Sequence, residues 1–104
     1  MTAPAKTSAD QVFAVLVEVD NRGEDPDEGR RGLREDLTPA MRQTPGFVSG
    51  LFMTAYDRGL GVGVVLLATR DQANQVASAF AVGSEIRPGV NVVRTEVLEV
   101  SATA

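Results

Sequence analysis

Two segments of this chain are apolar at odd and even positions alike. They are residues 12–17, Val-Phe-Ala-Val-Leu-Val, and residues 62–67, Val-Gly-Val-Val-Leu-Leu. Their β-branched residues favour strands, but an antiparallel strand with one solvated face would alternate apolar and polar residues. We therefore expect both faces of the sheet to be covered. The chain offers only two candidate helices, enough for one face, so the pattern predicts a homodimer in which a second copy covers the other.

Length and composition predict one globular domain. The chain has 104 residues, of which 43% are hydrophobic and 23% charged, as is usual for folded proteins. Residues 1–10 and 101–104 are small and polar, and we expect them to form flexible tails. Residues 11–100 are then the single domain.

Charge and residue usage exclude several classes of function. A net charge of -4 with Lys6 as the only lysine argues against a nucleic-acid partner, which would need clustered Lys and Arg. The chain has no Cys and no His, so it lacks thiolate ligands, the commonest metal ligand and the commonest general base. No run approaches the ~20 apolar residues of a membrane span. The sequence predicts a cytoplasmic protein with no metal, no cofactor, no nucleic acid and no membrane partner.

The first half of the domain reads as a strand followed by a helix. The strand covers residues 11–20, and Asp25 is the expected N-cap of the helix, with Pro26 at its first position and Glu28 completing a capping box. Thr38 is expected to cap a second piece of this helix at a break before Pro39. One face of the helix is expected to carry a narrow stripe of residues at helical spacing, which are Leu33, Leu37, Met41 and Thr44. Gly29 and Gly32 weaken the helix, and Pro45-Gly46 is expected to end it.

The second half reads as a hairpin, a helix and a strand. Residues 47–56 and 60–69 flank a turn at 57–59, and Asp71 is expected to cap a helix with a stripe of small apolar residues. Residues 90–100 form the last strand, predicted to place on one face Val90, Val92, Leu98 and Val100. The order βαββαβ with right-handed crossovers predicts an α+β fold, the ferredoxin-like sandwich with an antiparallel sheet.

Three segments resemble a known family. They are residues 45–50 (Pro-Gly-Phe-Val-Ser-Gly), the helix from Asp71 to Phe80, and residues 93–100 (Val-Arg-Thr-Glu-Val-Leu-Glu-Val). Together they resemble the dimeric α+β barrel superfamily, and within it the antibiotic-biosynthesis-monooxygenase-like (ABM-like) domains, over roughly residues 11–100. The resemblance implies two ferredoxin-like subunits packed sheet against sheet, each with a pocket between its own sheet and helices.

The resemblance leaves the reaction open. Members of that superfamily include cofactor-independent monooxygenases that act on polycyclic phenols, haem-degrading enzymes, isomerases and proteins of unknown role. The haem-degrading relatives use His and Trp, which this chain lacks. Quinone-forming relatives are similar in placing Trp, Asn, Tyr and Arg near the substrate, which makes weak catalytic candidates of Tyr56, Arg42 and Asn91. Two hypotheses follow. The first is a cofactor-independent monooxygenase or an isomerase that acts on a small hydrophobic or aromatic metabolite in the pocket beneath the first helix. The second is a non-catalytic homodimer that binds a hydrophobic molecule or only packs.

The hairpin supplies the ligand-binding candidates, Phe52, Tyr56, Gly61 and Gly63. If it closes around residues 57–60, Tyr56 lies opposite Gly61 and Thr54 opposite Gly63, where side chains are scarce. The favoured interpretation is that the rings of Phe52 and Tyr56 fill this gap, because cores are close-packed. The alternative is a small apolar pocket with the tyrosine hydroxyl as its polar group.

Three other features suggest chemistry only weakly. Residues 59–63, Gly-Leu-Gly-Val-Gly, open a strand rather than a helix and fit no phosphate-binding pattern. The acidic residues between Asp20 and Asp27 would suit calcium, but Arg22 occupies a ligand position, and a solvated loop is favoured. Glu18 in the first strand could act as a base, although pairing with Arg94 is the favoured role.

Overall fold

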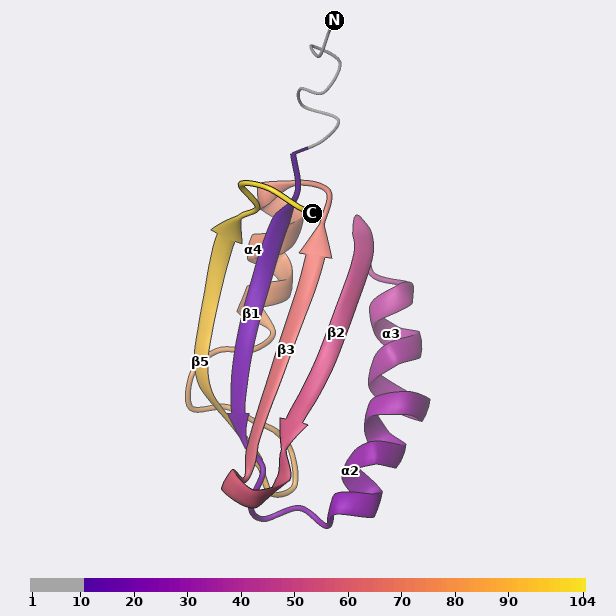
Figure 1. The fold of residues 1–104 in the computed structure, drawn as a ribbon, viewed down its shortest axis with the longest axis vertical. Helices are drawn as coiled ribbons and strands as arrows, with labels where there is room; N and C mark the ends of the chain where they lie inside the picture. Colours follow the sequence, from indigo (N-terminus) through magenta and orange to yellow (C-terminus); the bar gives the residue numbers. More distant parts are fainter. Residues whose placement is uncertain (1–10) are drawn as a thin grey trace, which may run out of the picture.

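The computed structural model describes residues 11–104, which form a five-stranded antiparallel sheet with its helices on one face (Figure 1). The predicted N-terminal tail lies outside the described residues. Residues 101–104 follow the last strand without regular structure and are exposed. The elements are β1 (Phe13–Asp20), α2 (Pro26–Gly32), η2 (Leu33–Leu37), α3 (Thr38–Arg42), β2 (Phe47–Ala55), η3 (Tyr56–Arg58), β3 (Leu60–Leu67), α4 (Arg70–Ser78), β4 (Glu85–Arg87) and β5 (Val90–Glu99).

The strand order is β2-β3-β1-β5-β4, and every neighbouring pair is antiparallel. The first helical segment, α2 to α3, joins β1 to β2, and α4 follows β3. This compact α+β arrangement is consistent with a ferredoxin-like fold, as the element order predicts. The short edge strand β4 is an addition that the sequence does not predict. It pairs with β5 across a turn at Pro88-Gly89, where Gly89 has a φ of 82°.

The core lies between the helices and one face of the sheet. Val15 and Leu67 on the central strands are completely buried, and Met41, Ala73 and Val76 contribute from the helices. Ala73 and Val76 belong to the predicted stripe of small residues, which allows α4 to approach β1 closely (Figure 1). The stripe is confirmed.

The opposite face of the sheet is mainly apolar, with Glu18, Arg94 and Glu96 as charged residues on it, and no element of residues 11–104 packs on it. We call it the open face. Several of its side chains are largely exposed: Leu51 at 64%, Met53 at 45% and Leu98 at 44%. Side chains alternate between the faces of a strand, so the pairing of the strands places on the open face Ala14, Leu16, Leu51, Met53, Val62, Val64, Leu66 and Leu98.

The last strand contradicts one prediction. Val92 lies opposite Val19 and Arg94 lies opposite Glu18, so β5 has an extra residue between them. Such a bulge reverses the direction of all side chains beyond it. Val90 and Val92 are buried, whereas Leu98 pairs with Ala14 on the open face and is exposed. The expected common face of Val90, Val92 and Leu98 is therefore wrong.

The first helical segment begins as predicted but is not divided at Thr38. Asp25 is its N-cap, and the Asp25 carboxylate accepts a hydrogen bond from the Glu28 backbone N–H at 3.1 Å. Thr38 has helical dihedrals and makes no side-chain cap; its N–H donates to the carbonyl of Leu33, closing a π-helical turn. Pro39 has no N–H to donate to the preceding turn, and the helix accommodates this by widening at η2 instead of breaking.

The second helix begins two residues earlier than expected. Thr69 is its N-cap, because Thr69 has extended dihedrals and its hydroxyl accepts from the Gln72 N–H at 3.1 Å. Asp71 lies inside the first turn, where a negative charge suits the helix dipole without capping it. The predicted cap at Asp71 is therefore wrong. Among the described residues, no helix is both long and apolar enough to cross a membrane.

Candidate functional site

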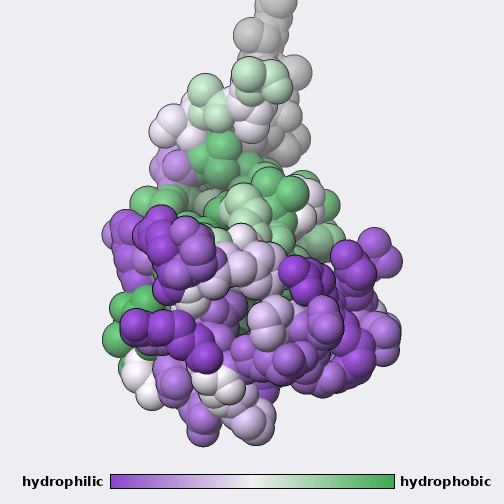
Figure 2. Space-filling view, turned by 60° about the horizontal axis from the view of Figure 1, so that its bottom comes forward, coloured by the Kyte–Doolittle hydropathy of each residue, from purple (hydrophilic) through white to green (hydrophobic). Residues whose placement is uncertain are grey.

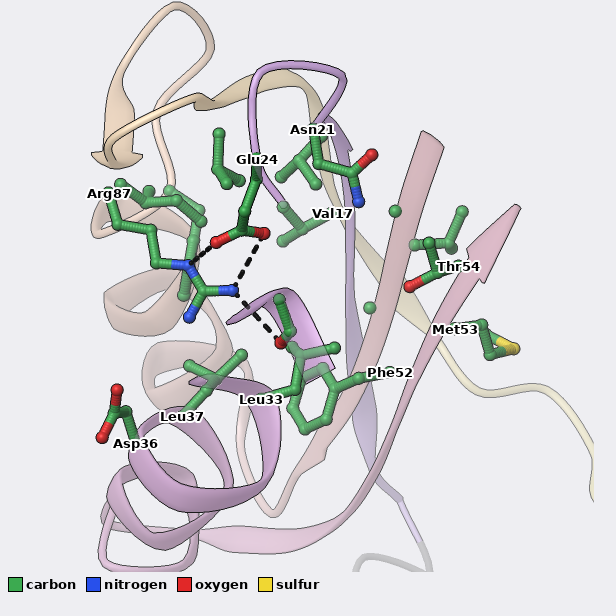
Figure 3. Close-up of a pocket in the computed structure, with 18 of the residues that line it drawn as sticks. Val17, Asn21, Glu24, Leu33, Asp36, Leu37, Phe52, Met53, Thr54 and Arg87 are labelled. Atoms are coloured by element: carbon green, nitrogen blue, oxygen red, sulfur yellow. Dashed lines mark hydrogen bonds and ion pairs between the residues drawn. The ribbon is translucent and has the colours of Figure 1, made fainter. Parts of the chain in front are cut away.

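A cavity of about 750 Å³ lies between the sheet and the first helical segment. Val17 and the backbone at Gly61 and Gly63 line it from the sheet, while Leu33 and Leu37 line it from the helix (Figure 3). Its volume falls within the range of about 300 to 1,000 Å³ typical of small-molecule sites. Mainly apolar side chains surround the interior, so the cavity suits an apolar ligand.

The cavity exists because the helix is packed on the sheet only near its C-terminal end. Met41 in α3 is buried in the core, but Leu33 and Leu37 are only partly buried and face the cavity. Opposite them the sheet presents glycines on β3 instead of large side chains. Neither layer supplies enough side-chain volume to close the space between them.

The hairpin is shifted by two residues from the predicted register. Thr54 lies opposite Gly61 and Phe52 opposite Gly63. The reason is η3: the chain turns through a 3-10 helix from Tyr56 and closes at Gly59, which has a φ of 62°. Tyr56 consequently lies in the turn, not in the strand pair.

Neighbouring side chains fill the space directly above both glycines. A Cβ at Gly63 would lie 3.2 Å from the Phe52 ring, and one at Gly61 would lie 2.7 Å from a methyl group of Val19. This agrees with the favoured sequence interpretation for Phe52. The cavity begins beyond these contacts, however, and Phe52, Tyr56, Gly61 and Gly63 all line it. Side chains therefore occupy the space next to the two glycines, and the cavity lies beyond those side chains.

The catalytic candidates are not brought together. Tyr56 lines the cavity, is 49% exposed, and lies below the Arg30 guanidinium, which is 4.4 Å from the ring centre. Arg42 is exposed at the end of α3, and Asn91 lies exposed on β5 opposite Asp20. Neither lines the cavity.

An ion pair between Glu24 and Arg87 spans one side of the cavity (Figure 3). The Nε of Arg87 donates to Oε2 of Glu24 at 2.8 Å, and Nη2 donates to Oε1 at 3.2 Å. Nη2 also lies 3.4 Å from the carbonyl oxygen of Gly29. The Glu24 side chain is only 10% exposed and that of Arg87 29%. The pair joins the loop before α2 to the edge strand β4.

Sequence reasoning does not identify Glu24 and Arg87 because they are 63 positions apart and belong to no motif. One sequence signal does relate to them. Gly29 and Gly32 weaken a helix, and both make room for the pair: a Cβ at Gly32 would lie 2.0 Å from Nη1 of Arg87, and one at Gly29 would lie 2.9 Å from Oε1 of Glu24. Two helical glycines nearly one turn apart thus indicate that side chains from other segments lie close to the backbone on this face of α2.

The end of the molecule at which the cavity opens is strongly hydrophilic. Figure 2 shows polar residues surrounding a hollow there. Asp20 in this region accepts hydrogen bonds from the backbone and the guanidinium of Arg22, and these bonds lower the pKa of Asp20 to about 2. Within residues 11–104, no group of three or more potential ligands is placed to hold a metal ion. Asp25 and Asp27 in this acidic loop are exposed, whereas the Glu24 carboxylate is largely buried against Arg87.

A second ion cluster lies on the open face, where β1 and β5 pair. Arg94 donates to Glu18 at 2.9 Å and also bonds Glu96. These bonds raise the pKa of Arg94. The pairing of Glu18 with Arg94 is therefore confirmed.

Comparison of this chain with models of known protein families and with curated proteins finds no match. The structure alone therefore establishes the architecture, which is a compact α+β fold with a five-stranded antiparallel sheet. The narrower relationship to ABM-like domains stays a prediction from the three quoted segments. Any function must be argued from the geometry of the cavity and the open face.

Proposed function

We propose that this protein binds a small, mainly apolar molecule in the cavity between its sheet and its first helical segment. The observation that carries this proposal is a preformed space of about 750 Å³ whose interior is lined by Val17, Leu33, Leu37 and Phe52. A cavity this large would ordinarily be closed by packing, because protein cores are close-packed. A flat aromatic compound of two or three rings would gain contacts with the side chains on both walls.

Binding is favoured over catalysis by the position of the candidate groups. A cofactor-independent monooxygenase of the ABM-like kind would need polar groups that converge on the substrate. Of Tyr56, Arg42 and Asn91, only Tyr56 lines the cavity, and its ring contacts Arg30. Oxygenation of a bound phenol is therefore the second candidate, and a non-catalytic ligand-binding module is the first.

We also propose that the functional unit is a homodimer joined through the open face. Large exposed apolar patches mark interaction sites in soluble proteins, and the open face carries exposed Leu51 and Met53 on β2 and exposed Leu98 on β5. A two-fold symmetric contact would pair the same patch with itself. The cavity lies on the opposite side of the sheet and would stay accessible in such a dimer.

Ligand binding can be tested with 2-naphthalenemethanol, a neutral two-ring probe, by titration calorimetry and thermal unfolding. A ligand at about 100 times its Kd should stabilise the fold by about 2.7 kcal/mol. Leu33→Trp places a large ring into the cavity and should weaken binding about tenfold or more while the protein stays folded. Glu35→Trp is the matched control, because Glu35 is exposed on the same helical segment and does not line the cavity.

Absence of binding to the wild type by any of a panel of neutral two- and three-ring compounds would overturn the ligand-binding proposal. If Leu33→Trp and Glu35→Trp lost the same amount of affinity for the probe, the probe would bind outside the cavity. The same experiment separates the two candidate functions when 2-naphthol replaces the alcohol. Oxygen consumption that depends on enzyme and on Tyr56 would favour the monooxygenase, whereas binding without oxygen consumption favours the ligand-binding module.

A further inference from the structure

We infer that Glu24 makes the cavity selective for uncharged ligands by occupying Arg87, the one cavity-lining arginine that is mostly buried. This inference rests on the proposed ligand binding. It names the class of molecule that the site accepts, small neutral aromatic compounds, and the class that it rejects, the corresponding carboxylates.

The geometry leaves Arg87 little capacity for a ligand anion. Two of its nitrogens, Nε and Nη2, face the two oxygens of Glu24 at 2.8 and 3.2 Å, which is the two-point geometry a ligand carboxylate would need. Nη1 is turned to the helix, since a Cβ at Gly32 would lie 2.0 Å from it. An incoming carboxylate would therefore have to displace Glu24.

Displacing Glu24 is unfavourable because its side chain is only 10% exposed. A carboxylate that loses its partner in such a place remains buried without compensation, and a single broken pair costs far more than an intact pair contributes. A neutral ligand leaves the pair intact and incurs no such cost. A site can therefore reject a charged analogue effectively when binding that analogue would leave a buried charge of the protein unpaired.

The other charges around the cavity act in the same direction. The charged residues that line it, apart from the Glu24 and Arg87 pair, are three carboxylates and one arginine: Asp25, Asp36, Glu85 and Arg22. The arginine is already paired with Asp20 at 2.6 Å. Asp36 is likewise paired with Arg31 at 3.1 Å, so the surplus of negative charge comes from Asp25 and Glu85. A ligand anion would thus meet a surplus of negative charge before it reached Arg87.

The test compares 2-naphthalenemethanol with 2-naphthoate, which have the same rings and differ mainly in the charge at pH 7. We expect the wild type to bind the alcohol and to bind the carboxylate at least about tenfold more weakly. Glu24→Gln keeps the size of the side chain and removes the competing charge. It should strengthen binding of 2-naphthoate relative to that of the alcohol, measured in the same variant, about tenfold or more.

Two controls assign the effect to Arg87. Glu85→Gln removes another cavity-lining carboxylate that does not contact Arg87, and it should give little gain for 2-naphthoate. The double variant Glu24→Gln, Arg87→Gln replaces the ion pair by two neutral amides and should lose the gain. Thermal unfolding of each variant establishes that it is folded.

The outcomes distinguish this inference from the proposal on which it rests. Equal binding of alcohol and carboxylate by the wild type would overturn the selectivity and leave ligand binding standing. This comparison needs no variant, so it decides the matter even if Glu24→Gln does not fold. If Glu24→Gln and Glu85→Gln strengthened binding of 2-naphthoate equally, the effect would come from the net charge around the cavity. That result would overturn the role of Arg87. Binding of neither probe, nor of any neutral compound, would overturn the proposed function itself.

Discussion

Gly32 shows how a residue that is unfavourable in a helix can be required by a neighbouring side chain. Glycine in a helix costs about 1 kcal/mol relative to alanine, and Gly32 lies in the middle of the first helical segment with helical dihedrals. Its lack of a Cβ lets the Arg87 guanidinium lie against the helix backbone. The residue lowers the stability of the helix and permits the ion pair that spans the cavity.

Gly32→Ala should therefore destabilise the protein, by about 1 to 2 kcal/mol, despite the better helix propensity of alanine. The new Cβ would lie 2.0 Å from Nη1 of Arg87 and must push the guanidinium away from Glu24. Chemical denaturation with urea measures the change. In the background Glu24→Gln, Arg87→Gln the guanidinium is absent, so the same substitution should stabilise by up to about 1 kcal/mol. An equal effect in both backgrounds would contradict the explanation.

At the scale of elements, the two helical segments differ in how they begin. Asp25 is an N-cap that the sequence identifies, because the cap, the following proline and the acidic first turn lie in consecutive positions. In the second helix, Thr69 and Asp71 are both suitable capping residues, and only the backbone conformation selects between them. Thr69 is extended and Asp71 is helical, so the cap is at Thr69.

Thr69→Ala should cost about 1 kcal/mol of unfolding free energy, because it leaves the Gln72 N–H without its acceptor. Asp71→Ala should cost only a few tenths, because Asp71 contributes only through the helix dipole. Thermal or urea denaturation of the two variants measures both values. A larger loss in Asp71→Ala than in Thr69→Ala would reverse the assignment of the cap.

At the scale of the whole molecule, the sheet separates the two proposed binding sites onto its two faces. The helical face holds the core and the cavity, and the open face carries exposed Leu51, Met53 and Leu98. A single chain of this size can cover one face only. The apolar residues of the other face then favour association with a surface of the same kind.

Val64→Asp and Val65→Asp test this separation with adjacent residues. Val64 is on the open face, between Leu16 and Leu51, and its replacement should abolish the proposed dimer while the subunit stays folded. Val65 is 4% exposed in the core, so a charge there should disrupt the fold, because an unpaired buried ion costs several kcal/mol. Sedimentation equilibrium and far-ultraviolet circular dichroism distinguish the two effects.

The control for the dimer is Val82→Asp, because Val82 is 66% exposed in the loop after α4 and lies outside the open face. It should leave both the dimer and the fold intact. A wild type that sediments as a monomer at micromolar concentration would contradict the proposed dimer.

The sequence by itself determines the local features of this protein. The order of the four long strands and the two helical segments, the cap at Asp25, the turn at Gly59, and the apolar residues on both faces of the sheet follow from residue type and spacing over a few positions. Each depends on the conformations that neighbouring residues allow, and these act over short distances along the chain. The placement of Phe52, Gly61 and Gly63 on adjacent strands of one hairpin belongs to this group, whereas their role in ligand binding stays a prediction.

Tertiary structure alone decides the features that depend on how distant segments meet. The bulge in β5 reverses the face of Leu98, and the turn at Tyr56 shifts the hairpin by two residues. The ion pair of Glu24 with Arg87 joins segments 63 residues apart, and the cavity exists because the helix packs on the sheet only near Met41. Register, bulges and gaps between layers depend on the fit of whole surfaces, and periodicity along one strand or helix does not contain that information.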